Sequence, residues 1–89
     1  MREAFVCINA SPDSIEEVLQ ELKACKEVQE AIRVHGVYDI IARVNGETFE
    51  ELSNIIDRRI KRLSQVQTTL SMLIIESNHP IGNGEVLLV

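Results

Sequence analysis

Gly36-Val37-Tyr38-Asp39-Ile40-Ile41-Ala42-Arg43-Val44 is the stretch around which this chain is organised. It begins with a turn residue, passes through an aromatic residue and an acid, and continues into β-branched residues that favour a strand. The pattern predicts a strand and then a helix before this stretch, and a helix and then a strand after it. We therefore expect any ligand site to lie where Gly36 to Asp39 enter that strand.

Composition limits what the chain can be. With 89 residues it is expected to form one domain, and 45% hydrophobic residues suffice for a core and for a subunit interface as well. Only 3% of the residues are aromatic, which argues against a surface that stacks nucleic-acid bases. A net charge of −5 argues against direct DNA binding by the domain.

Hydrophobic spacing predicts the order strand, helix, strand, strand, helix, strand. The expected elements are 4–10, 15–22, 28–35, 38–44, 49–63 and 66–76. Such an order consists of two split βαβ units, which predicts an α+β fold of the ferredoxin-like plait type. In this βαββαβ fold a four-stranded antiparallel sheet carries both helices on one face. We expect residues 1–78 to form this domain and residues 79–89 a tail, with 86–89 as a candidate short added strand.

The first strand is apolar on both sides. Ala4, Val6 and Ile8 point one way, while Phe5 and Cys7 point the other way. Because one layer of helices covers only one face, the second face is expected to meet a partner, and a homodimer that stacks two such faces is the simplest solution. This is an assembly of the dimeric α/β-barrel type.

Local signals refine the element boundaries. Alternation in 28–35 places Val28, Ile32 and Val34 on one side, and Gly36-Val37 is short enough for a hairpin. Either Ser11 or Ser14 caps the first helix. Thr48 and Glu51 form a possible capping box for the second helix.

The sequence gives little support for a disulfide framework, a metal site or a membrane segment. Cys7 and Cys25 are expected to be buried or half-buried free thiols, since two cysteines make no disulfide framework. The histidines have no metal-ligand spacing with them, so we expect no metal and no cofactor. There is neither a signal-peptide pattern nor an apolar run of membrane-spanning length, so the chain is predicted to be cytoplasmic.

Two motifs taken together resemble the C-terminal effector domain of the Lrp/AsnC family of transcriptional regulators. One is Gly36-Val37-Tyr38-Asp39 before the third strand, and the other is Val66-x-x-Thr69-x-Ser71 on the last long strand. The resemblance covers about residues 2 to 77. Because the first strand follows Met1 directly, the resemblance implies a stand-alone effector domain without the helix-turn-helix segment.

The resemblance also implies partners and a site. The family's domain forms homodimers that assemble into higher oligomers, an octamer or a similar ring, and binds a free amino acid between dimers. A full-length Lrp/AsnC regulator is a further implied partner, while no membrane is involved. The implied ligand-binding residues are Gly36, Val37, Tyr38, Asp39, Thr69 and Ser71. Backbone amides of a glycine-containing turn can hold a carboxylate, and the acid and the hydroxyls can bind an ammonium.

Plainer interpretations stand beside this one. Gly36 and Asp39 are common turn residues, Thr69 and Ser71 fit an ordinary strand, and Tyr38 fits interface packing. A structural oligomerisation module without a ligand is one alternative. A small dimeric α/β-barrel enzyme is another, but His35 is its only candidate base on a strand, so we expect no enzyme.

Overall fold

The computed structural model describes residues 2–75 and 86–88. Its elements are β1 (Arg2–Ala10), a 3₁₀ turn η1 (Pro12–Ser14), α1 (Ile15–Ala24), β2 (Val28–Arg33), β3 (Ile40–Gly46), α2 (Phe49–Ile55), a π-helical turn η2 (Ile56–Ile60), β4 (Val66–Ile74) and β5 (Val86–Leu88). The strands form one sheet in the order β2-β3-β1-β4-β5, and all neighbours are antiparallel. The predicted ferredoxin-like α+β fold is confirmed. The expected boundary between residues 78 and 79 lies outside the described residues.

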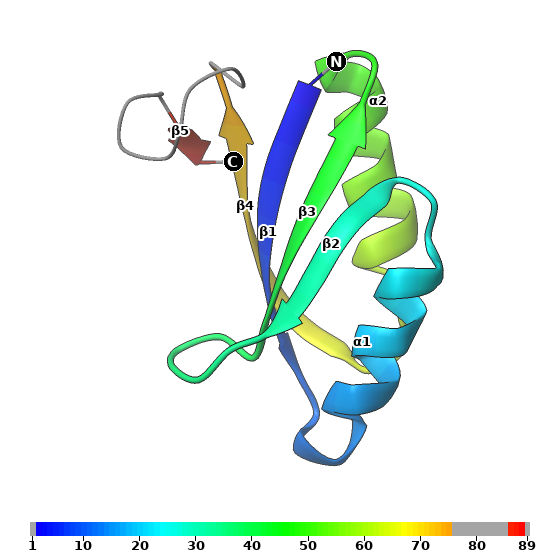
Figure 1. The fold of residues 1–89 in the computed structure, drawn as a ribbon, viewed down its shortest axis with the longest axis vertical. Helices are drawn as coiled ribbons and strands as arrows, with labels where there is room; N and C mark the ends of the chain where they lie inside the picture. The colour runs from blue at the N-terminus through cyan, green and yellow to red at the C-terminus, as the bar shows by residue number, and fades with distance from the viewer. Residues whose placement is uncertain (1, 76–85, 89) are drawn as a thin grey trace.

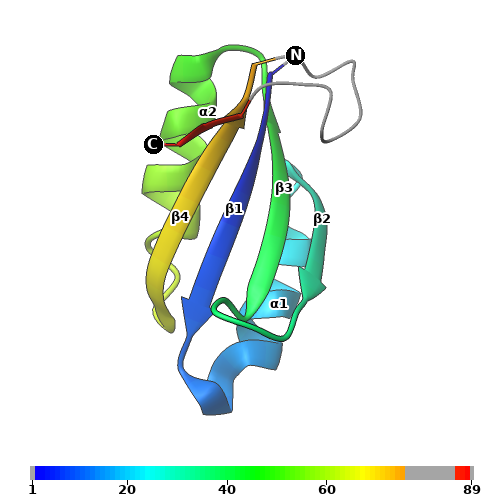
Figure 2. The ribbon, with the colours of Figure 1, turned by 90° about the vertical axis from the view of Figure 1, so that its left-hand side faces the viewer.

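Both helices pack on one face of the sheet, as Figures 1 and 2 show. Alternate residues of the central strands supply this face, and Val6, Ile8 and Ile40 have no exposed surface. Leu22 of α1 and Leu52 of α2 are equally buried. Burying a side chain of this size contributes about 1.5–3 kcal/mol, so this layer carries most of the core's stabilisation.

The start of α2 is fixed by the predicted cap Thr48, while the Glu51 side chain bonds the residue before the cap instead of closing a full capping box. The Thr48 hydroxyl accepts a hydrogen bond from the backbone N–H of Glu51 at 3.1 Å, and the Glu51 carboxylate accepts one from the N–H of Glu47 at 3.0 Å. Gly46 precedes it at a close approach, where a Cβ would lie 3.0 Å from the Leu52 nitrogen. The backbone of β3 and the first turn of α2 therefore meet directly.

The second helix is not uniform. After Ile55 it widens into η2, where the N–H of Lys61 bonds the carbonyl of Ile56 at 2.9 Å. Regular α-helices bond four residues apart, and turns of the π type are rare and often occur at functional sites. The expected single helix over 49–63 is therefore an α-helix followed by a π-turn.

Two expectations about the centre of the chain were wrong. The register of β2 against β3 shifts between Val28 and Glu30, so Val28 and Ala31 face the helices while Ile32 is 50% exposed on the other side. A strict alternation misses such a bulge, because the extra residue moves every later side chain to the opposite face. The connection from β2 to β3 occupies residues 34–39, so it is longer than the expected two-residue hairpin.

The open face of the sheet, turned away from the helices in Figure 2, carries an apolar row. Its members are register partners across four strands, namely Ile32, Ile41, Cys7 and Leu70. Phe5 and Met72 form a second pair beside Cys7 and Leu70. The sequence-based placement of Phe5 and Cys7 on the face opposite Ala4 and Val6 is confirmed.

One edge of this open face is polar. The Arg43 guanidinium lies 3.1 Å from the carboxylate of Glu3 and 3.6 Å from that of Glu30. Any partner that covers the apolar row therefore meets a defined charge pattern at its side, which favours one docking orientation over others.

The remaining local predictions concern the cysteines and the first helix. Cys7 is buried and Cys25 half-buried, and both are free thiols as expected. Pro12 opens η1, but neither Ser11 nor Ser14 caps a helix through its side chain. Across residues 2–75 and 86–88, no helix has the length and apolarity that crossing a membrane requires.

Candidate functional site

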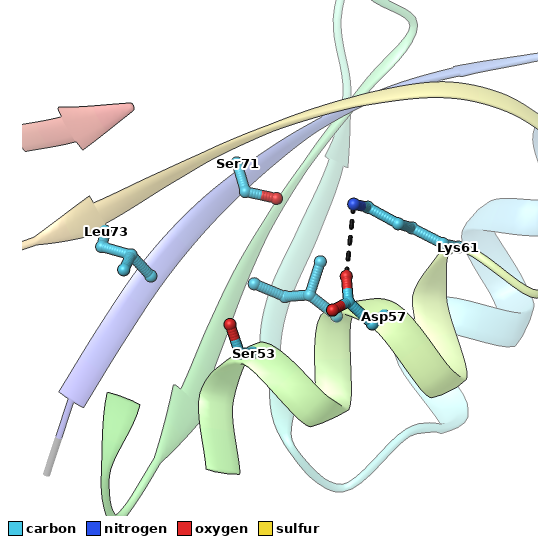
Figure 3. A pocket seen from close by; sticks show the side chains of 6 residues that line it. Ser53, Asp57, Lys61, Ser71 and Leu73 are labelled. Carbon is cyan, nitrogen blue, oxygen red and sulfur yellow. Dashed lines mark ion pairs between the residues drawn. The ribbon is translucent and has the colours of Figure 1, made fainter. Parts of the chain in front are cut away.

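A pocket opens between β4 and the helix formed by α2 and η2 (Figure 3). Its volume is about 220 Å³. The lining residues come from one helix face and one strand, namely Ser53, Ile56, Asp57, Lys61, Ser71 and Leu73. Since one water occupies about 30 Å³ of the liquid, the pocket has room for a metabolite of a few heavy atoms, well below a drug-sized ligand.

Ser71 forms a polar point inside this pocket. It pairs with Val6 of β1 and therefore points toward the helices, and only 4% of it is exposed. Its hydroxyl oxygen is buried and has no hydrogen-bond partner in the described structure. Figure 3 shows the hydroxyl directed from the strand into the space between β4 and the helix. A buried hydroxyl without a partner costs about 1–3 kcal/mol, so a bound molecule that supplies one gains affinity there.

Asp57 and Lys61 lie at the helix side of the pocket. They are four residues apart in sequence, and their charged groups are 3.2 Å apart. The side chains are 61% and 49% exposed respectively, so this pair is at the rim rather than in the core. Such a pair contributes about 0–1 kcal/mol, and a ligand with its own charges can replace it at little loss.

The pocket thus combines three kinds of polar group. Lys61 offers a cation for a carboxylate, Asp57 offers an anion for an ammonium, and Ser71 offers one neutral donor and acceptor. Ile56 and Leu73 supply apolar walls and are buried. This set fits the binding of a small zwitterion and includes no nucleophile activated by a neighbouring base.

The turn predicted as a ligand contact lies elsewhere. Gly36 has a φ of +158°, which side chains rarely adopt, although a Cβ there would meet nothing within 4 Å. The next residue, Val37, is 85% exposed, and Tyr38 is half-buried. The glycine is therefore required by the backbone path and not by a crowded neighbour.

Asp39 joins the ends of three strands. Its carboxylate accepts a hydrogen bond from the N–H of Ala10 at 3.0 Å. Its own N–H donates to the carbonyl of Ile8 at 3.0 Å, and its carbonyl accepts from Val34 at 2.9 Å. The Ala10 amide points to the β3 side of β1 and needs this acceptor because the pairing of β1 with β3 ends at Ile8 and Ile40. Asp39 thus has a structural role, and its carboxylate retains further acceptor capacity.

Within one chain the two halves of the predicted site remain apart. Thr69 pairs with Ile8 of β1 and shares the helix-facing side with Ser71, whereas the turn follows β2 and precedes β3. Strand β1 lies between β3 and β4. The turn residues do not line the pocket. Within one chain the turn and the pocket are therefore separate places on the surface.

Of the pocket residues that the sequence reasoning missed, three are polar. Ser53, Asp57 and Lys61 follow each other at intervals of four, which places them on one face of a helix. They run beside the apolar stripe of Leu52, Ile56 and Ile60. That polar stripe was the available signal.

No triad of metal-binding side chains occurs in the part of the chain that the structure describes. His35, the candidate base of the enzyme alternative, is exposed and lies outside the pocket. A catalytic base normally needs a shaped cavity around it, so this geometry gives the enzyme alternative no positive support.

Comparison with known proteins gives a consistent picture. The family model of the Lrp/AsnC ligand binding domain matches residues 3–80. The chain is 33% identical to the crystal structure of FFRP-DM1, with a TM-score of 0.80 over 82% of this chain and 97% of that one. It is 34% identical to hypothetical protein PHS023 from Pyrococcus horikoshii, with a TM-score of 0.79 over 89% of this chain and 96% of that one.

A more distant structure shares the fold alone. It is the complex of the transcriptional regulator NMB0573 from Neisseria meningitidis with L-Met, at 15% identity and a TM-score of 0.78. The alignment covers 89% of this chain and 53% of the regulator. The chain thus spans about half the length of that protein and nearly all of the two shorter ones. Among curated proteins, none matches the chain.

Proposed function

Because the chain belongs to the family of Lrp/AsnC ligand-binding domains, we propose that it is an oligomeric effector module that binds a free amino acid and acts on transcription. Ser71 carries the proposal from within the chain. Its buried, unpartnered hydroxyl points into a pocket that also holds a cation and an anion. The complex of the Neisseria regulator with L-Met shows that one protein of this fold takes an amino acid.

The proposed oligomer begins with a homodimer through the open face. An apolar row of Ile32, Ile41, Cys7 and Leu70 on a solvent-facing sheet is a surface that associates in water. Two-fold symmetry would place each row against its own copy. Dimers then assemble into a ring. In this ring the turn at residues 36–39 of one dimer lies against the pocket of another dimer.

A full-length Lrp/AsnC regulator is the partner through which such a module would act on transcription. Similar interface surfaces on this chain and on the regulator's effector domain would allow a mixed oligomer. In it the regulator would supply DNA binding, and this chain would alter the assembly or its response to the ligand. The cytoplasmic location expected from the sequence remains a prediction.

A thermal-shift screen against the twenty amino acids tests the effector role directly. A ligand that binds only the folded state stabilises it by about 2.7 kcal/mol at a hundredfold excess over Kd. At least one amino acid should therefore raise the melting temperature by several degrees. D-enantiomers at the same concentration provide the control for non-specific solute effects. If no amino acid shifts the transition at millimolar concentration, the chain is a structural oligomerisation module instead.

A further inference from the structure

We infer that the pocket selects amino acids whose side chain is small, neutral and able to form a hydrogen bond, that is, a hydroxyl or an amide. This inference rests on the proposed function and specifies its ligand class. It assigns the rim pair of Asp57 and Lys61 to the charged groups of the amino acid. It assigns the buried hydroxyl of Ser71 to the tip of the ligand side chain.

The rim suits the charged end of the ligand. Asp57 and Lys61 are 3.2 Å apart and half-exposed, so each charge remains hydrated when their mutual contact opens. An α-ammonium that approaches Asp57 and an α-carboxylate that approaches Lys61 replace one ion pair by two. Figure 3 shows both side chains on the helix side of the pocket, with Lys61 extended toward β4.

The interior suits a neutral polar group. Ser71 is 4% exposed, and the buried side chains of Ile56 and Leu73 flank it. A charged side chain placed there would lose its hydration and gain a single neutral partner, which does not compensate a buried charge. An apolar side chain would leave the Ser71 hydroxyl unpaired, as it is now. A hydroxyl or amide satisfies both sides of the contact.

Size adds a second restriction. With a volume of about 220 Å³, the pocket is smaller than the roughly 300–1,000 Å³ of typical ligand pockets, which favours a small amino acid over one with a large aromatic side chain. Together, the rim, the interior and the volume favour threonine, serine and asparagine over valine, aspartate and phenylalanine.

Threonine and valine provide the sharpest comparison, because they share one shape and differ by one hydroxyl. We would titrate each into the full chain by calorimetry. The parent protein should bind threonine about tenfold more tightly than valine, the effect of leaving one buried hydrogen-bonding group unpaired. In Ser71→Ala the two should bind within about twofold of each other, since the discriminating partner is gone. This variant should fold, because it removes a buried polar atom that has no partner.

Two further variants separate the rim from the interior. Lys61→Met should weaken the binding of threonine and of valine by the same factor, because it changes the contact with the α-carboxylate that both ligands carry. The ratio of their two Kd values should therefore stay the same. Ser64→Ala, an exposed hydroxyl in the turn after η2, should change neither affinity nor ratio.

The outcomes are distinct. Binding of amino acids without discrimination between threonine and valine overturns this inference and leaves the effector function intact. A preference for threonine over valine that persists in Ser71→Ala overturns the inference as well, since another group would then bind the threonine hydroxyl. Failure of the parent to bind any of the twenty amino acids overturns the effector function and the inference together.

Discussion

At the scale of single residues, Asp39 shows how a motif residue can serve the fold. A carboxylate at the start of a strand suggested a ligand contact, and the structure gives it the otherwise unpaired amide of Ala10. The sequence could not reveal this partner, because the amide lies where the pairing of β1 with β3 ends, and that end is set by tertiary structure. A role in binding stays a prediction and is separable from the structural one by mutation.

Replacement of Asp39 by alanine should therefore destabilise the protein. The Ala10 amide loses its acceptor in a partly buried position, which costs about 1–3 kcal/mol. Asp39→Asn keeps one carbonyl oxygen for the same bond and should recover most of the loss. Urea unfolding of both variants at one protein concentration measures the difference. Equal midpoints for the parent and Asp39→Ala would show that the bond contributes nothing, and unchanged ligand affinity in Asp39→Asn would remove the charge from the site.

The two cysteines should differ in reactivity. Burial raises the pKa of the Cys7 thiol, so at a given pH less of it is the reactive thiolate. Cys25 is half-buried near the end of α1. With iodoacetamide near pH 8, peptide mass spectrometry should find Cys25 modified first. The difference between the modification rates of Cys25 and Cys7 should become smaller as the pH rises. The variant Cys25→Ser leaves Cys7 as the single thiol, so the slow modification of Cys7 can be measured by itself. Faster labelling of Cys7 at neutral pH would mean that the open face is more accessible than the structure indicates.

At the scale of elements, the sequence predicted what local periodicity encodes. The two faces of β1, the cap at Thr48 and the order of strands and helices all follow from spacing along the chain. The bulge in β2 and the π-turn after Ile55 do not, since each inserts a residue into an otherwise regular pattern. The pocket depends on that π-turn, because Ile56 and Lys61 both line it and are joined by the wider hydrogen bond.

The Thr48 cap makes a quantitative prediction. Thr48→Ala removes the acceptor for the Glu51 N–H and should destabilise the protein by about 1 kcal/mol. For a domain of this size the melting temperature should fall by about 4–8 °C. Ser64→Ala removes an exposed hydroxyl from a turn and serves as the matched control. Calorimetric melting at equal concentrations compares the two, and equal melting temperatures would show that α2 starts without help from its cap.

At the scale of the whole molecule, the sheet leaves one face without helices. The sequence predicted a partner for one face because the first strand is apolar on both sides, and the register now places Cys7, Leu70, Ile41 and Ile32 in one row. It could not predict that Ser71 faces the helices, since alternation defines two sides without saying which one is covered. The same strand thus contributes one side to a proposed subunit interface and the other to a proposed ligand pocket.

The open face predicts a homodimer at micromolar concentration and a specific way to break it. Leu70→Glu places a carboxylate in the apolar row, and two-fold symmetry introduces it twice into one interface. Removing each charge from water without a partner costs several kcal/mol, so dissociation should become readily measurable. Gln67→Glu adds the same charge to an exposed position on the same strand, at the shift of register between β1 and β4 and outside the apolar row, and it should leave the dimer intact.

Sedimentation velocity over a range of concentrations distinguishes these cases, and circular dichroism reports the fold. Loss of structure together with dissociation in Leu70→Glu supports the same conclusion, because an obligate dimer has no stable folded monomer. A folded monomer of the parent at micromolar concentration would contradict the homodimer. A Leu70→Glu dimer as tight as the parent's would instead place the interface on another surface, since an apolar row that tolerates a carboxylate is not buried between subunits.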